Sequence, residues 1–450
     1  MFFAVLLIAI SVRVLTFQFM RAHLNDASWF QFGSFAIFDQ QAKDILDGRQ
    51  PIFLINDSSR TDLVQYPPAY PATVAFIYKL SRNRSAYAVQ SVQSIADLFI
   101  SFLIVGGIAV TAFDWRVAIA AGFLLALSPL FAMYAAYPSA DIPTTWLVLA
   151  GNWLLLIAAR RNNAWFALCA GLILGAACWL RVNPLYLCLF WAIAVFLVVN
   201  ATRRRRLLLS SAVVAGTIFV VSPIVVRNYL TFPDFTPTGG TIGVNLWEGL
   251  GETELGRSNG FMFGDQKMVE RERIKMGLPV GTLITPQWPD GIRRDRERTR
   301  ESLSFIREHP VWYAGVMFGR MWTMLKVAGK PSPYGGSAGI NVTSKKCLPS
   351  NRQGGLVGIY VNGLGMLQSV VRYSLIPLTI FGVYLAVRKD LLVAGVLLMT
   401  IFYYLVPGTA AHTEIRYVLP MHALLIVFGG LGLDRLVRLS RSLLQLKNSS

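Results

Sequence analysis

The chain has 450 residues, of which 54% are hydrophobic and only 15% charged, and its formal net charge is +18. Soluble domains carry about a quarter charged residues, so this composition excludes an ordinary soluble protein. The basic residues lie mostly in short turns between apolar runs, a pattern that orients helices in a bilayer and does not indicate a nucleic-acid partner. The sequence predicts an all-α polytopic membrane protein in which residues 1–450 form a single integral membrane domain.

Apolar runs long enough to cross roughly 30 Å of hydrocarbon recur along the chain. Ten such segments are expected, at residues 1–18, 87–112, 117–135, 141–159, 164–181, 184–200, 207–226, 374–387, 391–408 and 417–434. Residues 312–328 and 354–371 are also apolar, but the first segment carries Arg320 and Lys326 and the second is rich in glycine. Either both cross the membrane or both lie along its surface, because the orientation of everything after them depends on their number. The expected bundle therefore has 10–12 spans.

The distribution of basic turns predicts the orientation of these spans. Basic turns at Arg116, Arg160–Arg161, Arg203–Arg206 and Arg388–Lys389 alternate with nearly uncharged turns. Assigning the basic turns to the cytoplasm places both termini inside and two long loops outside, at residues 19–86 and 227–311. The apolar start lacks the basic region and cleavage site of a signal peptide, so we expect a retained first span. Short arginine-rich turns suit a bacterial inner (plasma) membrane.

The two outside loops are long enough to need structure of their own. The first is expected to contain an amphipathic helix at residues 37–46, followed by the proline-rich corner at Tyr66-Pro67-Pro68. Proline fixes the backbone and breaks helices, so this corner should be rigid and should lie on the membrane surface. The second loop contains a charged segment at 266–309, in which residues 293–300 especially predict a solvated amphipathic helix.

Two acidic residues of the outer face are candidates for chemistry. Asp39 starts the helix of the first loop, and Asp141 opens the span at 141–159. Each carboxylate can simply cap its helix, since an acid is stabilised at a helix N-terminus. Alternatively, the two share a cleft, in which one acts as a base and the other, or a divalent metal ion held by both, orients the substrates. Asp97 lies within a span, where an acid is either functional or hydrogen-bonded to a neighbouring helix.

Basic side chains gather at the same membrane boundary. Arg181, Arg227, Arg320 and Arg416 are all expected there. Arginine makes forked, charge-assisted hydrogen bonds to phosphate oxygens, so one or two of these could neutralise a phosphate, while the others extend to lipid head groups. His412, Glu414 and Arg416 cluster at the mouth of the last span, where a phosphorylated lipid head group would fit.

The order of several motifs resembles the GT-C superfamily of membrane glycosyltransferases, most closely the protein O-mannosyltransferase-like group (glycosyltransferase family 39) and bacterial relatives such as the lipid A aminoarabinose transferase. The matching features span about 400 residues: Asp39 to Gly48, Tyr66-Pro67-Pro68, Tyr137 to Asp141, Gly171, Gly175, Arg181 and Pro184, Arg227-Asn228-Tyr229, Gly239-Gly240, Asn245-Leu246-Trp247, and His412, Arg416, Tyr417 and Pro420. One departure is Asp39-Gln40, where many relatives have Asp-Glu. This departure leaves the dependence on metal open.

The resemblance implies a transferase that uses a polyprenyl-phosphate-linked sugar and inverts the anomeric carbon. Asp39 would act as the general base, and Asp141 would orient the acceptor or a metal ion. Arg416 and Arg227 would bind the donor phosphate, with His412 assisting and Tyr66 at the same phosphate site. A glycan, a lipid or a protein hydroxyl would be the acceptor, and the lipid tail of the donor would lie between spans at the outer face.

Two other functions fit a chain of this composition. A transporter or flippase of lipid-linked sugars would need functional charges deep in the membrane and usually an internal repeat, which the sequence does not display. A polysaccharide polymerase or ligase would place a basic pair in one large late loop and would not need the acid of the first loop.

Overall fold

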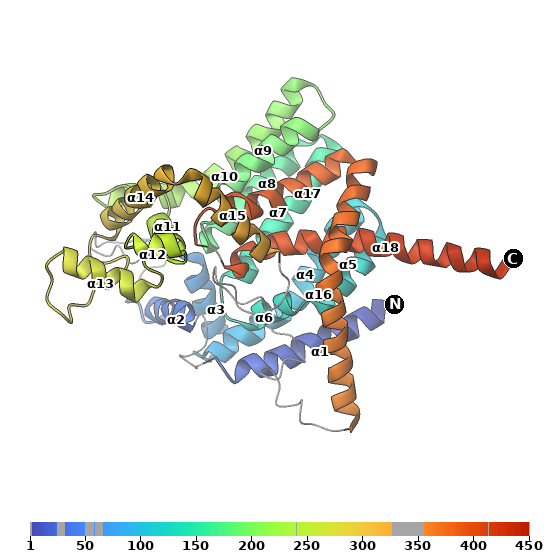
Figure 1. Cartoon of the computed structure of the whole chain (residues 1–450), viewed down its shortest axis with the longest axis horizontal. Helices are drawn as coiled ribbons and strands as arrows, with labels where there is room; N and C mark the ends of the chain where they lie inside the picture. Colours follow the sequence, from blue (N-terminus) through green and yellow to red (C-terminus); the bar gives the residue numbers. More distant parts are fainter. Residues whose placement is uncertain are drawn as a thin grey trace.

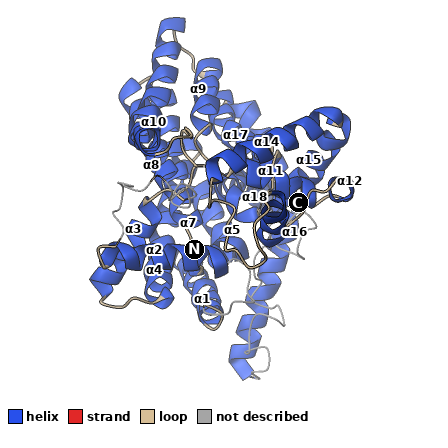
Figure 2. Ribbon diagram, turned by 90° about the vertical axis from the view of Figure 1, so that its left-hand side faces the viewer, coloured by secondary structure: helices blue, strands red, loops and turns tan. Residues whose placement is uncertain are grey.

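The protein is described here by a computed structural model, which covers residues 2–24, 32–49, 58, 66–239, 241–325, 355–412 and 414–449; of residues 32–34 and 446–449 only the backbone is described. The regular structure of this part of the chain is helical throughout (Figure 2), apart from one isolated bridge between Thr285 and Trp288. The predicted all-α class is confirmed.

Seven helices in the described residues are long and apolar enough to cross a membrane. They are α1 (Phe2–Arg21), α4 (Ala86–Ala112), α7 (Asp141–Arg161), α10 (Arg203–Thr231), α16 (Gly355–Lys389), α17 (Leu391–Leu405) and α18 (Leu419–Ser449). An eighth candidate is the pair α5 (Trp115–Leu127) and α6 (Pro129–Ala136), bent by 62° at Ser128. The shorter apolar helices α8 (Ala164–Leu180) and α9 (Leu187–Val198) complete the set, so each of the ten expected segments corresponds to a helix or to this bent pair.

The two ambiguous segments differ from each other in the structure. Residues 355–371 are not a separate segment, because α16 continues without a break through 374–387 and is 35 residues long. The apolar run is interrupted at Arg372, but arginine is a good helix former, so its charge interrupts the hydropathy without ending the helix. The segment at 312–328 corresponds to α15 (Pro310–Met324), and its residues 326–328 lie outside the described part of the chain. The described helices therefore do not form 12 separate spans, because residues 355–371 and 374–387 belong to one helix.

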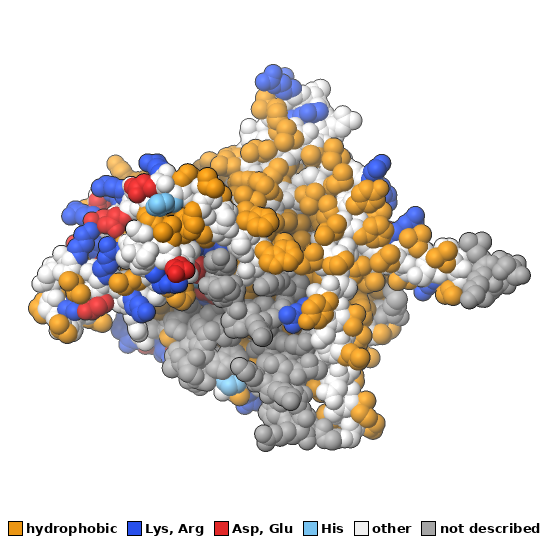
Figure 3. All heavy atoms as spheres, viewed as in Figure 1, with side chains coloured by type: hydrophobic (Ala, Val, Ile, Leu, Met, Phe, Trp, Pro, Cys, Tyr) orange, Lys and Arg blue, Asp and Glu red, His pale blue; other side chains and the backbone are white. Residues whose placement is uncertain are grey.

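The polar helices lie together at one end of the molecule. In Figure 1, α11 (Ile242–Gly251), α12 (Glu254–Ser258), α13 (Asp265–Lys275) and α14 (Gly291–Glu308) lie at the left, whereas α1 begins and α18 ends toward the right. On the face shown in Figure 3, charged side chains gather over this left-hand end and hydrophobic side chains cover much of the remaining surface. α2 (Phe32–Leu46) and α3 (Ala69–Ser81) also lie toward the left in Figure 1.

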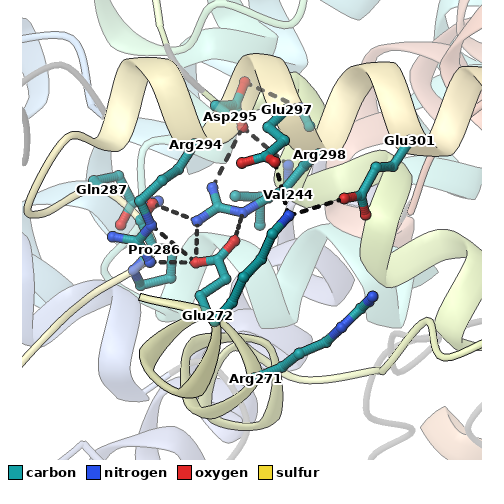
Figure 4. A network of polar contacts seen from close by, with 12 residues as sticks. Val244, Arg271, Glu272, Pro286, Gln287, Arg294, Asp295, Glu297, Arg298 and Glu301 are labelled. Atoms are coloured by element: carbon teal, nitrogen blue, oxygen red, sulfur yellow. Dashed lines mark hydrogen bonds and ion pairs between the residues drawn. The ribbon is translucent and has the colours of Figure 1, made fainter. Parts of the chain in front are cut away.

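α13 and α14 are joined by ion pairs that the sequence pattern did not indicate. Glu272 of α13 lies between Arg294 and Arg298 of α14 (Figure 4), accepting from Nε of Arg294 at 3.0 Å and from Nε of Arg298 at 2.5 Å. Both arginines are buried. The segment 293–300 is thus an amphipathic helix as predicted, but the prediction that it is solvated is wrong for the face that carries Arg294 and Arg298.

α8 and α10 pack closely because a glycine lies between them. A Cβ atom added at Gly171 would lie 2.1 Å from the backbone oxygen of Val213, so any side chain at this position would push the two helices apart. Small residues at such contacts let transmembrane helices approach each other when no hydrophobic force drives them together. The contact holds α8 against α10, and α8 ends just before Arg181.

A buried ion pair joins α1 to α4. Arg13 donates from Nη2 and Nε to Oδ2 of Asp97 at 3.0 and 3.2 Å, and the two residues are 5% and 0% exposed. Asp97 also accepts from Nε1 of Trp146 at 3.1 Å and from the hydroxyl of Ser101. These contacts favour the helix-pairing interpretation of Asp97 over a role in catalysis.

Replacing Asp97 with asparagine should destabilise the protein by roughly 3 kcal/mol, because Arg13 would be left without a counter-charge in a span. The measurement is the midpoint of thermal unfolding in detergent. Arg438→Gln is the matched control, since Arg438 is 40% exposed where it pairs with Asp434 and Asp114, and the loss of such a pair costs at most about 1 kcal/mol. Equal shifts in the two variants would contradict a structural role for the Arg13–Asp97 pair.

Candidate functional site

A cavity of about 830 Å³ opens where the ends of several helices meet. Its wall is formed by the turn after α8, by α11, by the start of α13, and by the chain that joins α17 to α18. Six acidic, basic or histidine side chains line it: Arg181, Glu248, Asp265, His412, Glu414 and Arg416. Such a concentration of charge beside apolar helices is expensive unless the groups are paired or bind a ligand.

The basic residues of the cavity lie where helices are forced to end. α8 stops at Leu180, and Arg181 is extended because the segment continues to Asn183-Pro184, where proline cannot extend the helix. Pro407 likewise follows α17 and opens a short 3₁₀ turn. A second 3₁₀ turn, Ile415–Val418, carries Arg416 directly into the start of α18. These helix ends present their side chains to the cavity.

Five side chains of alternating charge run through the packed residues beside this cavity. Arg320 of α15 donates from Nη2 to Oε2 of Glu252 at 3.3 Å, and Oε1 of Glu252 lies 2.6 Å from Nδ1 of His412. Nε2 of His412 lies 3.7 Å from Oε1 of Glu414, which accepts from Nη2 of Arg416 at 2.8 Å. We call this set the charge chain. It joins α15, the α11–α12 junction and the segment before α18.

The charge chain requires the histidine to be cationic. Burial disfavours the imidazolium, but the hydrogen bonds to Glu252 and Glu414 outweigh burial and raise the pKa of His412 well above its usual range. His412 therefore places a positive charge between two carboxylates, and each member of the chain has an opposite neighbour. Arg320 is 0% exposed and also donates from Nη2 to the backbone oxygen of Gly249 at 2.6 Å.

Close packing around Gly249 fixes the positions of two members of the charge chain. A Cβ atom at Gly249 would lie 2.7 Å from the backbone nitrogen of His412 and 2.9 Å from Nη2 of Arg320, so only glycine fits there. The same backbone nitrogen donates to the carbonyl oxygen of Asn245 at 2.7 Å. α11 thus contacts the backbone on which His412 is carried.

Arg416 has hydrogen-bonding capacity that its surroundings leave unused. The residue is 7% exposed and donates from Nη2 to Glu414 and to the hydroxyl of Tyr417 at 3.2 Å. Its Nε and Nη1 are buried and have no hydrogen-bond partner among the described residues. A buried donor without an acceptor costs about 1–3 kcal/mol. An anion in the cavity would supply acceptors for this guanidinium, and phosphate suits its forked geometry.

A second arginine of the cavity is positioned by Asp141. Nε and Nη2 of Arg181 lie 3.0 and 3.2 Å from the two carboxylate oxygens of Asp141, which is buried at the start of α7. The guanidinium also lies 5.1 Å from the ring centre of Tyr417. Asp141 is not among the residues that line the cavity, so in this structure it contacts the site through Arg181.

The predicted site residues fall into two groups. Tyr66, His412 and Arg416 line the cavity together, and burial raises the pKa of Tyr66. Asp39 and Arg227 are not among the lining residues. Asp39 accepts from Nζ of Lys43 at 2.7 Å and from the hydroxyl of Tyr78 at 2.6 Å, while Arg227 donates to the side chain of Asn228. The catalytic role of Asp39 and the phosphate-binding role of Arg227 stay predictions.

The metal-binding role of Asp39 and Asp141 stays a prediction. Asp39 contacts Lys43 and Asp141 contacts Arg181, so each carboxylate already has a basic partner. In the described part of the chain, no three histidine, cysteine, aspartate or glutamate side chains are grouped as they would be around a metal ion. We therefore derive no chemical step through a metal.

Sequence reasoning missed two further acids that line the cavity, Glu248 and Asp265. Burial, followed by the nearby charge of Asp265, raises the pKa of Glu248 to about 7. Burial is also the main cause that raises the pKa of Asp265. One signal was available, because Glu248 directly follows the Asn245-Leu246-Trp247 motif. No pattern placed Asp265 beside it, since that contact depends on the turn between α12 and α13.

Residues 65–227 match the sequence profile of a family described as dolichyl-phosphate-mannose-protein mannosyltransferase. This match covers less than half of the chain. No curated protein sequence matches the chain significantly.

Solved structures of the oligosaccharyltransferase of Archaeoglobus fulgidus have a similar fold. The apo form is 14% identical with a TM-score of 0.51, over 98% of this chain and 52% of that one. The complex with an inhibitory peptide and a dolichol-phosphate gives 14% and 0.50 over the same shares. The complex with zinc and sulfate gives 12% and 0.50, over 98% and 51%. The present chain thus spans about half the length of these structures.

These two findings define the class. The chain is a multi-pass membrane protein whose fold is similar to that of an archaeal oligosaccharyltransferase. Its residues 65–227 match the protein mannosyltransferase profile, so the resemblance seen in the order of its motifs is confirmed.

Replacing Glu252 with glutamine should lower the pKa of His412, because the carboxylate nearest its Nδ1 would be lost. Histidine NMR on the protein in nanodiscs measures this directly, and Glu254→Gln, an exposed neighbour, is the control. The raised pKa means that the pair stabilises the fold fully below the unfolded value of about 6.5 and loses this contribution as pH rises through the folded value. The stability gap between wild type and Glu252→Gln should therefore narrow at high pH. An unchanged titration of His412 would contradict the charge chain.

Proposed function

We propose that the protein is a membrane glycosyltransferase that moves a sugar from a polyprenyl-phosphate-linked donor to an acceptor hydroxyl at the outer face of the membrane, with inversion at the anomeric carbon. The observation that carries this proposal is the buried guanidinium of Arg416, whose Nε and Nη1 have no hydrogen-bond partner among the described residues and which lines the 830 Å³ cavity. The family match and the fold support the same donor class.

The phosphate of the donor would bind between Arg416 and Arg181. Both line the cavity, and Tyr417 contacts both, since each guanidinium lies about 5 Å from its ring centre. The apolar lining residues Leu189 and Phe190 belong to α9, which offers a surface for the lipid tail next to the charged pocket. When the sugar leaves, the phosphate gains negative charge, and fixed donors stabilise such developing charge.

The outer face would be the non-cytoplasmic side of a bacterial inner membrane, with both termini in the cytoplasm. The distribution of basic turns supports this orientation. It is also in keeping with the arrangement in Figure 1, where the polar helices lie opposite the beginning of α1 and the end of α18. The acceptor is a glycan, a lipid or a protein hydroxyl.

The assignment of Asp39 as the base stays a proposal with a structural condition. To act as the base, the carboxylate of Asp39 would have to leave Lys43 and Tyr78 and approach the cavity. Such a change would require α2 to move. We expected Asp141 to orient the acceptor or a metal ion, but its contact with Arg181 supports a role in fixing that arginine at the donor site. A transporter is a weaker alternative, because the deep charges Arg13 and Asp97 are occupied with each other.

Arg416→Ala should lower the rate of sugar transfer by about 10²–10³-fold, the usual effect of losing one donor to a developing negative charge. The assay supplies purified protein in nanodiscs with a panel of radiolabelled polyprenyl-phosphate sugars and candidate acceptors. Arg438→Ala, which changes an exposed arginine near the end of α18, should transfer at the wild-type rate. If Arg416→Ala altered only the yield of folded protein and left its specific activity intact, Arg416 would be structural.

A further inference from the structure

The acid pair formed by Glu248 and Asp265 is the part of the cavity that donor binding does not use. Glu248 lies on α11, and Asp265 is the first residue of α13. Glu248 shares a hydrogen bond with Asp265. Both side chains line the same cavity as Arg416 and His412.

This pair differs from every other charged group on the cavity wall. Arg181 pairs with Asp141, Arg416 with Glu414, and His412 with Glu252 and, at 3.7 Å, Glu414. Neither Glu248 nor Asp265 forms an ion pair within the described residues; Arg298 and His412 act on Asp265 only through space. Two carboxyl groups that share a hydrogen bond cannot both ionise easily, so the pair holds a proton that it can exchange.

We infer that Glu248, hydrogen-bonded to Asp265, is the group that takes the proton from the acceptor hydroxyl. The inference rests on the proposed function and assigns its proton-accepting step to Glu248 in place of Asp39. A second, independent observation ties the acids to a ligand site: Arg416 is more than nine-tenths buried on the same cavity wall, and two of its nitrogens lack partners among the described residues. The cavity thus brings an anion-binding group and a proton-accepting group together.

The proposed step balances as follows. The acceptor oxygen attacks the anomeric carbon of the donor, a C–O bond forms, and the bond between that carbon and the phosphate oxygen breaks. The electron pair of the broken bond stays on the phosphate, which faces Arg416 and Arg181. The acceptor proton passes to the carboxylate of Glu248, and the glycosylated acceptor and polyprenyl phosphate leave. Glu248 then returns the proton to water, and Asp265 stabilises the protonated form through the shared hydrogen bond.

Location distinguishes Glu248 from Asp39. Asp39 is bound by Lys43 and Tyr78 and is not among the residues that line the cavity, whereas Glu248 lines it, forms no ion pair within the described residues and is influenced by His412 only through space. The raised pKa of Glu248, about 7, also suits a base, since efficient proton transfer needs a pKa near the operating pH. Only the deprotonated form can accept a proton, so the transfer rate should rise with pH and level off above about pH 7.

The test compares Glu248→Gln, Asp39→Asn and the exposed control Glu254→Gln in nanodiscs. The donor is whichever polyprenyl-phosphate sugar of the panel the wild type uses, and binding is measured separately with polyprenyl phosphate alone. Glu248→Gln should lower kcat by about 10²–10⁴-fold, the usual contribution of a general base, while binding polyprenyl phosphate within about twofold of wild type. Its residual rate should lose the inflection near pH 7. Glu254→Gln should keep both the rate and the pH profile.

Asp265→Asn adds a readout that a purely structural role would not move. The variant removes the neighbouring carboxylate, so the inflection in the pH profile should shift to lower pH while transfer persists. Infrared titration of the carboxylic-acid carbonyl band follows the same proton without substrate, and the band that titrates near neutral pH should be absent in Glu248→Gln.

The outcomes separate the two proposals. If the wild type transfers sugar, and Glu248→Gln retains its rate and pH profile while Asp39→Asn is inactive, the inference is overturned and the proposed function stands. If the wild type transfers sugar from no donor of the panel, the proposed function and the inference built on it both fail. Weak binding of polyprenyl phosphate by Glu248→Gln, in step with its loss of transfer, would also overturn the inference, because Glu248 would then serve binding.

Discussion

The structure around the cavity depends on the rule that charge removed from water must be paired. The charge chain satisfies this rule over three separate segments, with Arg320 in α15, Glu252 between α11 and α12, and His412 before α18. No single pair would suffice, because each carboxylate has two oxygens to satisfy and the buried arginines carry several donors each. A cationic His412 between Glu252 and Glu414 closes the series.

This pairing also explains how a large loop becomes part of a membrane domain. The helices α11–α14 have a small apolar core around Trp247 and Phe305 and a polar joint at Glu272, so they can pack together. Their attachment to the bundle includes the contacts of Arg320, Gly249 and His412. Since these contacts are polar, specific and close-packed, the acids on α11 and α13 acquire fixed positions over the ends of α8 and α17.

The sequence predicted the features that depend on neighbouring residues better than those that depend on contacts between distant segments. The apolar segments were readable because hydropathy is a local property, and the break misplaced at Arg372 arose where charge and helix propensity disagree. Tyr66, His412 and Arg416 were found through motifs at helix ends. Glu248 and Asp265 were missed because each looks like an ordinary loop acid until the fold brings them together. Two further placements, the burial of Arg298 and the occupation of Asp39 by Lys43 and Tyr78, likewise follow from packing.

The charged groups that line the cavity differ in how fully they are paired, and this difference suits the proposed transfer of a sugar. Arg416 begins with one carboxylate at Nη2 and unused donors at Nε and Nη1, so an incoming phosphate adds acceptors without displacing Glu414. In the proposed transfer, the phosphate gains charge as the sugar departs, and the acceptor proton passes to Glu248, which lines the same cavity as Asp265. Negative charge therefore increases next to the arginines while it decreases at the acid pair. The fixed donors of Arg416 and Arg181 stabilise the charge that develops on the phosphate, and the raised pKa of Glu248 favours its uptake of the proton.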